Sequence, residues 1–122
     1  MFKATGVRHA EVALVDTGCT HTTIDERVAQ LMCVHKPEIT IETPQDVADA
    51  IRQQYPTVFI QTAKGILKGY KTTLRHFECG EKTYKDLSVY VANLPDYNLP
   101  LLGNELGVIL GLDVLQDHIK FA

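Results

Sequence analysis

The sequence between Pro56 and Asn93 limits the fold more than any other part of the chain. It is rich in β-branched and aromatic residues, which favour strands, and short groups of turn residues interrupt it. The pattern predicts three strands joined as two successive hairpins. The strands are expected at Thr57 to Thr62, Ile66 to Phe77 and Thr83 to Val91, with turns near Lys64-Gly65 and at Cys79 to Lys82.

Two segments before this region have the spacing of short helices. Asp25 is placed to cap the first one, and apolar residues recur at helical spacing as far as Met32, which predicts a helix of about ten residues. Thr43 is expected as the N-cap of the second helix, which ends before Pro56. The buried face of this second helix is expected to hold Val47, Ala50 and Ile51.

Most of the remaining chain is irregular or short. Asn93 to Gly107 contains two prolines and two glycines and is expected to be a loop. Val108 to Gly111 is expected to be a short apolar strand, and Leu112 to Gln116 a helical turn. With 122 residues and no repeat or linker, the chain is predicted to form one domain over 1–122. Its class is mainly β, a closed β-barrel-like fold with two or three short helices.

Composition excludes several functions. The formal charge of -3 and the pI near 5.9 leave no positive surplus for phosphate backbones or anionic lipid, so neither nucleic acid nor a membrane is an expected partner. No apolar run is long enough to span a bilayer, and the first fifteen residues lack a signal-peptide pattern, so the cytoplasm is the expected compartment. The odd number of cysteines favours reduced thiols, and all three are expected to be small buried hydrophobes: Cys19, Cys33 and Cys79.

The most informative motif is an acid in a tight turn. The apolar run Ala10 to Val15 predicts a strand that leads directly into Asp16, Thr17 and Gly18. A second element, Ile109 to Gly111 followed by a helical turn, comes later in the chain, and a hairpin containing Gly65 lies between the two. The order of acid turn, hairpin and apolar-apolar-Gly is more specific than the Asp-Thr-Gly triplet alone.

In this order and spacing the chain resembles the retropepsin-like, or retroviral-type, aspartic proteases from about Ala10 to its end. The resemblance implies the acid protease fold and an aspartic-type endopeptidase that needs no cofactor and no metal. Two positions differ from the retroviral members, which usually have an acid at the position of Thr20 and an arginine at the position of Leu112. The non-viral cellular and bacterial members are therefore the nearer comparison.

The resemblance assigns the catalytic residues. Asp16 is implied as the catalytic carboxylate, Thr17 as a hydroxyl donor to the partner's backbone, and Gly18 as the point where a substrate main chain approaches closely. Aspartic peptidases activate water between two carboxylates that share a proton, and this chain offers one such turn. A twofold homodimer with two copies of Asp16 face to face would supply both acids, with a peptide or protein as substrate.

The resemblance also assigns the residues around the substrate. Ala63, Lys64 and Gly65 lie at the tip of a hairpin that looks like the family's flap. Ile109, Leu110 and Gly111 look like the floor beside the acid turn, with Leu101 to Asn104 as a rival for that role. The segment His118 to Ala122 is a candidate dimer strand, and Phe2 to Val15 is long enough for one hairpin.

Four other interpretations of these motifs remain. The acid turn also resembles the phosphate loop of the sugar kinase and actin superfamily, although those proteins need two domains. The pairs Cys19-x-His21 and Cys33-x-His35 contain ligand types that bind zinc. Asp16 alone is compatible with a turn carboxylate that caps local N–H groups. Finally, the chain is compatible with a retropepsin-like dimerisation or peptide-binding module that lacks efficient proteolysis.

Overall fold

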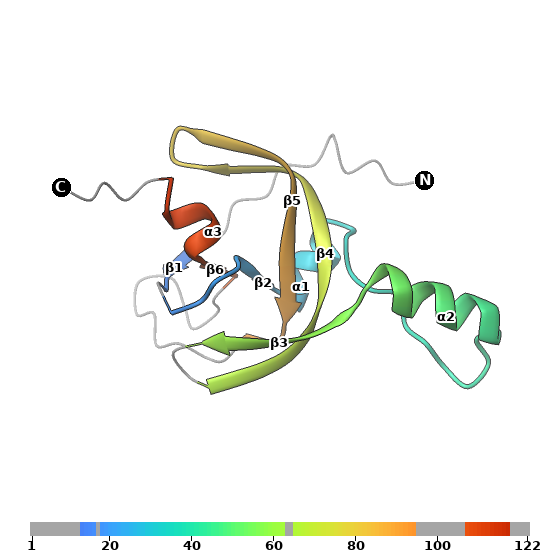
Figure 1. Ribbon diagram of the computed structural model, residues 1–122. Coiled ribbons are helices and arrows are strands. Elements are labelled where there is room, and N and C mark those ends of the chain that lie inside the picture. Colours follow the sequence, from blue (N-terminus) through green and yellow to red (C-terminus); the bar gives the residue numbers. More distant parts are fainter. Residues whose placement is uncertain (1–12, 17, 63–64, 95–106, 118–122) are drawn as a thin grey trace.

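The computed structural model describes residues 13–16, 18–62, 65–94 and 107–117, and it shows a mainly β protein (Figure 1). Within these ranges, six strands form one curled half-barrel sheet in the order β1-β6-β2-β5-β4-β3, with three short helices. The expected class, mainly β with two or three short helices, is confirmed. The strands are β1 (Ala13–Val15), β2 (Thr23–Asp25), β3 (Thr57–Thr62), β4 (Gly65–Cys79), β5 (Lys82–Ala92) and β6 (Val108–Leu110).

The two expected hairpins are present. β3 pairs antiparallel with the first part of β4, and the rest of β4 pairs antiparallel with β5. The long β4 is therefore shared by both hairpins and curves with the sheet (Figure 1). Four parts of the sequence prediction lie outside the described residues: the tip residues Ala63 and Lys64, the segment Leu101 to Asn104, the candidate dimer strand His118 to Ala122 and most of the expected N-terminal hairpin.

The short strand β6 is inserted between the two strands that flank the acid turn. It pairs parallel with β1 and antiparallel with β2, and β2 continues the sheet by pairing parallel with β5. This arrangement joins residues 13–25 to residues 108–110, which are far away in the sequence. The strand expected at Val108 to Gly111 is thus confirmed, and α3 (Leu112–Leu115) follows it as the expected helical turn.

The first helix begins as expected but is shorter. The Asp25 carboxylate accepts a hydrogen bond from the Arg27 N–H and caps α1 (Glu26–Leu31). The expected length of about ten residues is wrong. The chain leaves the helix at Cys33, whose φ of 58° is left-handed, while Cys33 N–H donates to the Gln30 carbonyl and Val34 N–H to the Ala29 carbonyl. These two bonds form a Schellman motif, which ends a helix early.

The second helix, α2 (Gln45–Gln54), corrects two expectations. Its N-cap is Pro44 and not Thr43, whose hydroxyl instead accepts a hydrogen bond from the Thr40 N–H. Its buried residue is Ala48, whereas Val47 and Ala50 are exposed. Figure 1 shows why: α2 projects from the sheet, so helical periodicity did not identify a face against the core.

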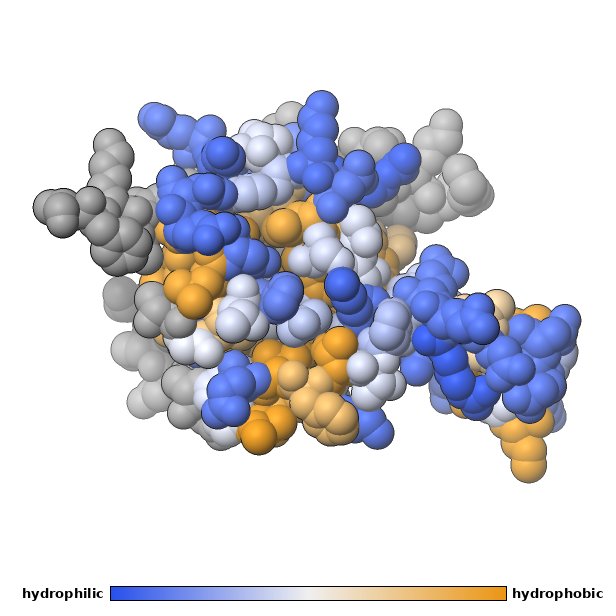
Figure 2. Space-filling model, in the orientation of Figure 1, coloured by the Kyte–Doolittle hydropathy of each residue, from blue (hydrophilic) through white to orange (hydrophobic). Residues whose placement is uncertain are grey.

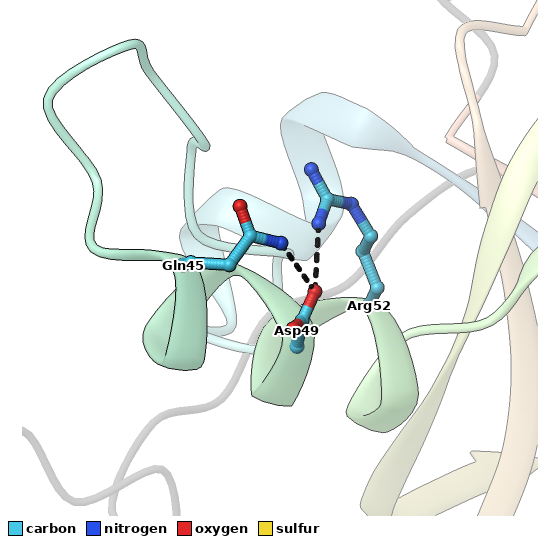
Figure 3. Close-up of polar contacts among 3 residues, drawn as sticks. All are labelled: Gln45, Asp49 and Arg52. Carbon is cyan, nitrogen blue, oxygen red and sulfur yellow. Dashed lines mark hydrogen bonds and ion pairs between the residues drawn. The ribbon is translucent and has the colours of Figure 1, made fainter.

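Polar side chains on α2 pair with one another along the helix. The Asp49 carboxylate accepts hydrogen bonds from the Gln45 side-chain amide at 2.9 Å and from the Arg52 guanidinium at 3.1 Å (Figure 3). Both side chains of the ion pair are more than half exposed. Contacts of this kind contribute about 0.3–0.5 kcal/mol each. They support the helix locally, and the surface of this projecting part is mainly hydrophilic (Figure 2).

The main core lies between the curled sheet and helices α1 and α3. One cluster contains fully buried Ile24, Val89 and Val91 with the buried faces of α1 and α3. A second cluster joins Ile60 of β3 to Cys19 and Ile109, beside the acid turn. Within the described ranges, no helix has the length and apolar character needed to cross a membrane.

The Schellman motif at Cys33 predicts a stabilising substitution. A non-glycine residue in the left-handed region is strained, and glycine removes that strain at the expense of a more flexible unfolded chain. We expect Cys33→Gly to raise the free energy of unfolding by about 0.5–1 kcal/mol. Cys33→Ala, which keeps the Cβ, should leave it unchanged in urea denaturation. An equal response of both variants would contradict the assignment of strain to this position.

Candidate active site

Asp16 lies at the end of β1, in a turn whose backbone holds its carboxylate. Its N–H donates to the Leu110 carbonyl of β6 at 3.2 Å, and its own carbonyl accepts from the Cys19 N–H at 3.1 Å. The carboxylate Oδ1 accepts a hydrogen bond from the Gly18 N–H at 2.9 Å. The side chain is therefore oriented by the turn that follows it, and it is only partly buried. Thr17, the other predicted member of this turn, lies outside the described residues.

Gly18 makes room for this carboxylate. A Cβ at residue 18 would lie 3.2 Å from Asp16 Oδ1, which is closer than an ordinary contact. The glycine backbone is exposed. A carboxylate and an accessible main chain are thus side by side at this turn.

The predicted floor residues pack against the acid turn. Ile109 is completely buried, Leu110 is nearly so, and the Leu110 carbonyl accepts from Asp16. Gly111 follows β6 at the point where the chain meets the backbone of His21, and a Cβ at residue 111 would lie 2.5 Å from the His21 carbonyl carbon. Only glycine permits this approach, because no side chain fits in that space. The structure thus brings Asp16, Gly18, Ile109, Leu110 and Gly111 together.

The first turn of α3 holds the far end of the acid loop, the segment from Asp16 to Thr20. The Leu112 N–H donates to the Cys19 carbonyl at 2.8 Å, and the Asp113 N–H donates to the Thr20 carbonyl at 3.1 Å. These are N–H groups that the start of a helix leaves without intrahelical partners. Thr20 and Leu112, where retroviral enzymes have an ion pair, are therefore joined to this region through their backbones.

Asp113 is a residue whose role the sequence did not reveal. Its carboxylate accepts from the Thr22 N–H at 3.0 Å, from the Thr22 hydroxyl at 2.9 Å and from the Val114 N–H at 2.9 Å. Thr22 is completely buried, and its Oγ1 also accepts from the Gly111 N–H at 3.3 Å. The signal that could have found this residue is an acid in the first turn of a helix, where the helix dipole favours negative charge.

The cysteine that follows Gly18 is a packed side chain. Cys19 is 2% exposed, and its thiol donates to the His21 carbonyl at 3.0 Å. Burial raises the pKa of the Cys19 thiol, although hydrogen bonds with Thr23 and His21 oppose the rise. The expectation of a small buried hydrophobe is therefore confirmed for Cys19. It is wrong for Cys33, which is exposed, and for Cys79, which is half-buried.

An aromatic pair lies next to the acid loop. The His21 ring stacks on Tyr90 of β5 with centroids 4.5 Å apart, and its Nδ1 is 3.0 Å from the Thr20 hydroxyl.

Among the described residues, no group of three or more His, Cys, Asp and Glu side chains is arranged to hold a metal ion.

The predicted flap reaches the same region. Ile60 of β3 is 2% exposed and belongs to the cluster with Cys19 and Ile109, and Leu67 of β4 packs on that cluster. Gly65, the described residue of the predicted tip, begins β4 with a φ of 119° that favours glycine. One face of the hairpin is thus turned toward the acid turn, while Phe59 and Ile66 are exposed at 71% and 67%.

These features define a class of protein. A carboxylate oriented in an Asp-x-Gly turn, an apolar-apolar-Gly strand beside it and a hairpin packed against the same cluster lie together in this structure. A family model for aspartyl proteases matches residues 5–114. The chain belongs to the aspartyl protease family, of the retropepsin-like type. Neither the search of curated proteins nor that of solved structures found a match.

The anchoring role of Asp113 predicts a specific loss of stability. Asp113→Ala leaves the buried N–H and hydroxyl of Thr22 without their acceptor, so we expect the free energy of unfolding to fall by about 2–3 kcal/mol. Asp113→Asn keeps one acceptor oxygen and should cost about half as much. As a control, Asp117→Ala removes a carboxylate that accepts from the Tyr84 hydroxyl at an exposed site. Equal destabilisation by Asp113→Ala and Asp117→Ala in chemical denaturation would argue against the anchor.

Proposed function

We propose that the protein is an aspartic endopeptidase that acts as a homodimer and hydrolyses peptide bonds, with residues 1–122 as one catalytic domain. The observation that carries the proposal is the position of Asp16. Its carboxylate is oriented by Gly18 and its backbone is joined to β6, in a chain of the aspartyl protease family. Each protomer contributes one such acid, and a twofold axis beside the turn brings two of them together.

The chemistry needs one ionised and one protonated carboxylate. Two carboxyl groups about 3 Å apart cannot both ionise, so the pair keeps one proton. The ionised group takes a proton from a bound water as the water oxygen attacks the carbonyl carbon, and the protonated group donates to the carbonyl oxygen. The proton taken from water then passes to the amide nitrogen as the C–N bond breaks, which releases the amine and the carboxylic acid. Thr17 donates its hydroxyl to the partner's backbone, and Gly18 lets the substrate main chain approach the acids.

The hairpin and the floor complete the proposed substrate site. Ala63, Lys64 and Gly65 form the tip of the flap, which closes over the peptide and excludes water. Ile109, Leu110 and Gly111 support the acids from below. The packing of Ile60 against Cys19 and Ile109 supports this arrangement, because it connects the flap to the acid loop.

The free thiols fit a reducing compartment, and we propose the cytoplasm.

Replacing the Asp16 carboxylate tests the proposed activity directly. Asp16→Asn keeps a polar side chain that accepts from Gly18 but removes the ionisable group, so peptide cleavage at mildly acid pH should fall by at least about a thousand-fold. The measurement is turnover of a peptide library by both proteins, with circular dichroism to show that the variant is folded. Equal turnover by wild type and variant would eliminate the proposal. Dimerisation and peptide binding without turnover in either protein would favour the non-proteolytic module.

The second prediction tests whether the acids come from two chains. Mixing a fixed amount of wild type with increasing Asp16→Asn protein forms heterodimers that carry one ionisable acid instead of two. Activity per wild-type chain should therefore fall as the variant is added in excess. Asp49→Asn, on the projecting helix α2, is the matched control and should not inhibit. A constant activity in the presence of excess Asp16→Asn would contradict a shared dyad.

A further inference from the structure

Tyr70 occupies the point where the proposed flap leaves the sheet. In the register of β4, residues before Tyr70 pair with β3 and residues after it pair with β5. Tyr70 itself pairs with Thr57 of β3 and with Val91 of β5. It is the one residue of β4 that belongs to both ladders, so the flap hairpin is attached to the rest of the sheet at this position.

The backbone beside Tyr70 is closely packed. A Cβ at Gly69 would overlap the carbonyl oxygen of Val91, so β4 and β5 approach one another more closely here than a side chain would allow. On the other side, the Lys71 N–H donates to the Pro56 carbonyl at 3.0 Å. The base of the hairpin is thus fixed at Gly69 to Lys71, and the described residues of β4 before Tyr70 have no register pair with β5.

The Tyr70 side chain ties this base to a different part of the fold. Its hydroxyl donates to Glu26 Oε2 of α1 at 2.8 Å and accepts from the Lys36 N–H at 2.9 Å. The Tyr55 ring packs edge-on against it, with centroids 5.8 Å apart. Burial raises the pKa of the Tyr70 hydroxyl and Glu26 adds to the rise, so the hydroxyl stays protonated and able to donate.

The helix α1, whose Glu26 accepts the hydrogen bond from Tyr70, is itself held by hydrogen bonds to the Asp25 carboxylate. Asp25 precedes Glu26, and its carboxylate accepts from the Arg27 N–H at 3.0 Å and from the Leu94 N–H at 2.9 Å. Asp25 is also the last residue of β2, which pairs with β6 beside the acid turn. A continuous chain of contacts therefore runs from the flap base through Tyr70, α1 and β2 to the strand that supports Asp16.

The surroundings of the hydroxyl allow this bond to break and re-form. Tyr70 and Glu26 line an open groove of about 560 Å³, together with Gln30 and Glu38. The Tyr70 ring packs on the core cluster and against Tyr55, while its hydroxyl lies at the groove, so the hydrogen bond is the contact of this side chain that solvent can replace. The hydrogen bond itself is part-buried and is made to a carboxylate.

We propose that Tyr70 is a positioning residue for the flap: its hydroxyl latches the base of the β3–β4 hairpin to Glu26 and to the Lys36 backbone. The latch sets the angle at which the hairpin approaches the acid turn and the fraction of molecules in which the hairpin is closed. This inference rests on the proposed function, in which the hairpin covers a peptide substrate.

The first test measures the flap without any substrate. Tyr70→Phe removes the donor, and Glu26→Ala removes the acceptor. Both should raise hydrogen exchange of the backbone amides in residues 57–62 and 65–69 about five-fold. Glu26→Gln keeps an acceptor oxygen and should exchange at the wild-type rate. If Tyr70→Phe does not fold, Glu26→Ala against Glu26→Gln makes the same comparison.

Thr72 provides a matched control two residues along β4. Its hydroxyl donates to the Val34 carbonyl at 2.9 Å, in the same segment that contains Lys36, but Thr72 pairs only with β5. Thr72→Val should lower the melting temperature without changing flap exchange. Faster exchange of the hairpin amides in Thr72→Val, or unchanged exchange in Tyr70→Phe and Glu26→Ala, would contradict the proposed role of the Tyr70 hydroxyl.

The second test is kinetic. In Tyr70→Phe and Glu26→Ala, the KM for a cleaved peptide should rise about five-fold while kcat changes less than two-fold, and Glu26→Gln should restore KM. A fall in kcat with unchanged KM would contradict a role in closing the flap. If wild type cleaves no peptide, the proposed function fails, while the exchange experiment still decides whether the latch exists.

Discussion

The close approach of Gly111 to the His21 backbone is the contact on which the rest of the site depends. It lets β6 lie between β1 and β2, and it brings the first turn of α3 within reach of the Cys19 and Thr20 carbonyls. The acid loop is then held from both ends by backbone hydrogen bonds. A strand of three residues is therefore enough to present Asp16 in a fixed orientation.

The site reaches this rigidity without the ion pair of the retroviral enzymes. Thr20 and Leu112 replace the acid and the arginine, and a buried ion pair has to overcome the desolvation of two charges. Here one carboxylate, that of Asp113, accepts from the N–H and the hydroxyl of buried Thr22 at the start of a helix. A helix N-terminus favours such a charge, so no second charged partner is needed.

Local signals in the sequence predicted the hairpins, β6, α3 and the Asp25 cap, because each depends on neighbouring residues. The end of α1 was missed since Cys33, and not glycine, adopts the left-handed conformation there. The prediction of the buried face of α2 was wrong, because helical periodicity does not reveal that a helix projects from the sheet (Figure 1). The role of Asp113 depends on a contact with Thr22, 91 positions away, which no local pattern contains.

The two halves of the proposed site differ in how firmly they are attached. The acid turn is held by several backbone hydrogen bonds and by the buried strand β6, so moving it would break these contacts together. The hairpin pairs with β5 at one register position, and the Tyr70 hydroxyl and the packing of Ile60 against Cys19 and Ile109 add to that attachment. Catalysis needs fixed acids, whereas substrate entry needs a cover that opens at a low cost in free energy. The proposed site is consistent with both needs, because many backbone hydrogen bonds hold the acid turn, whereas few join the hairpin to β5.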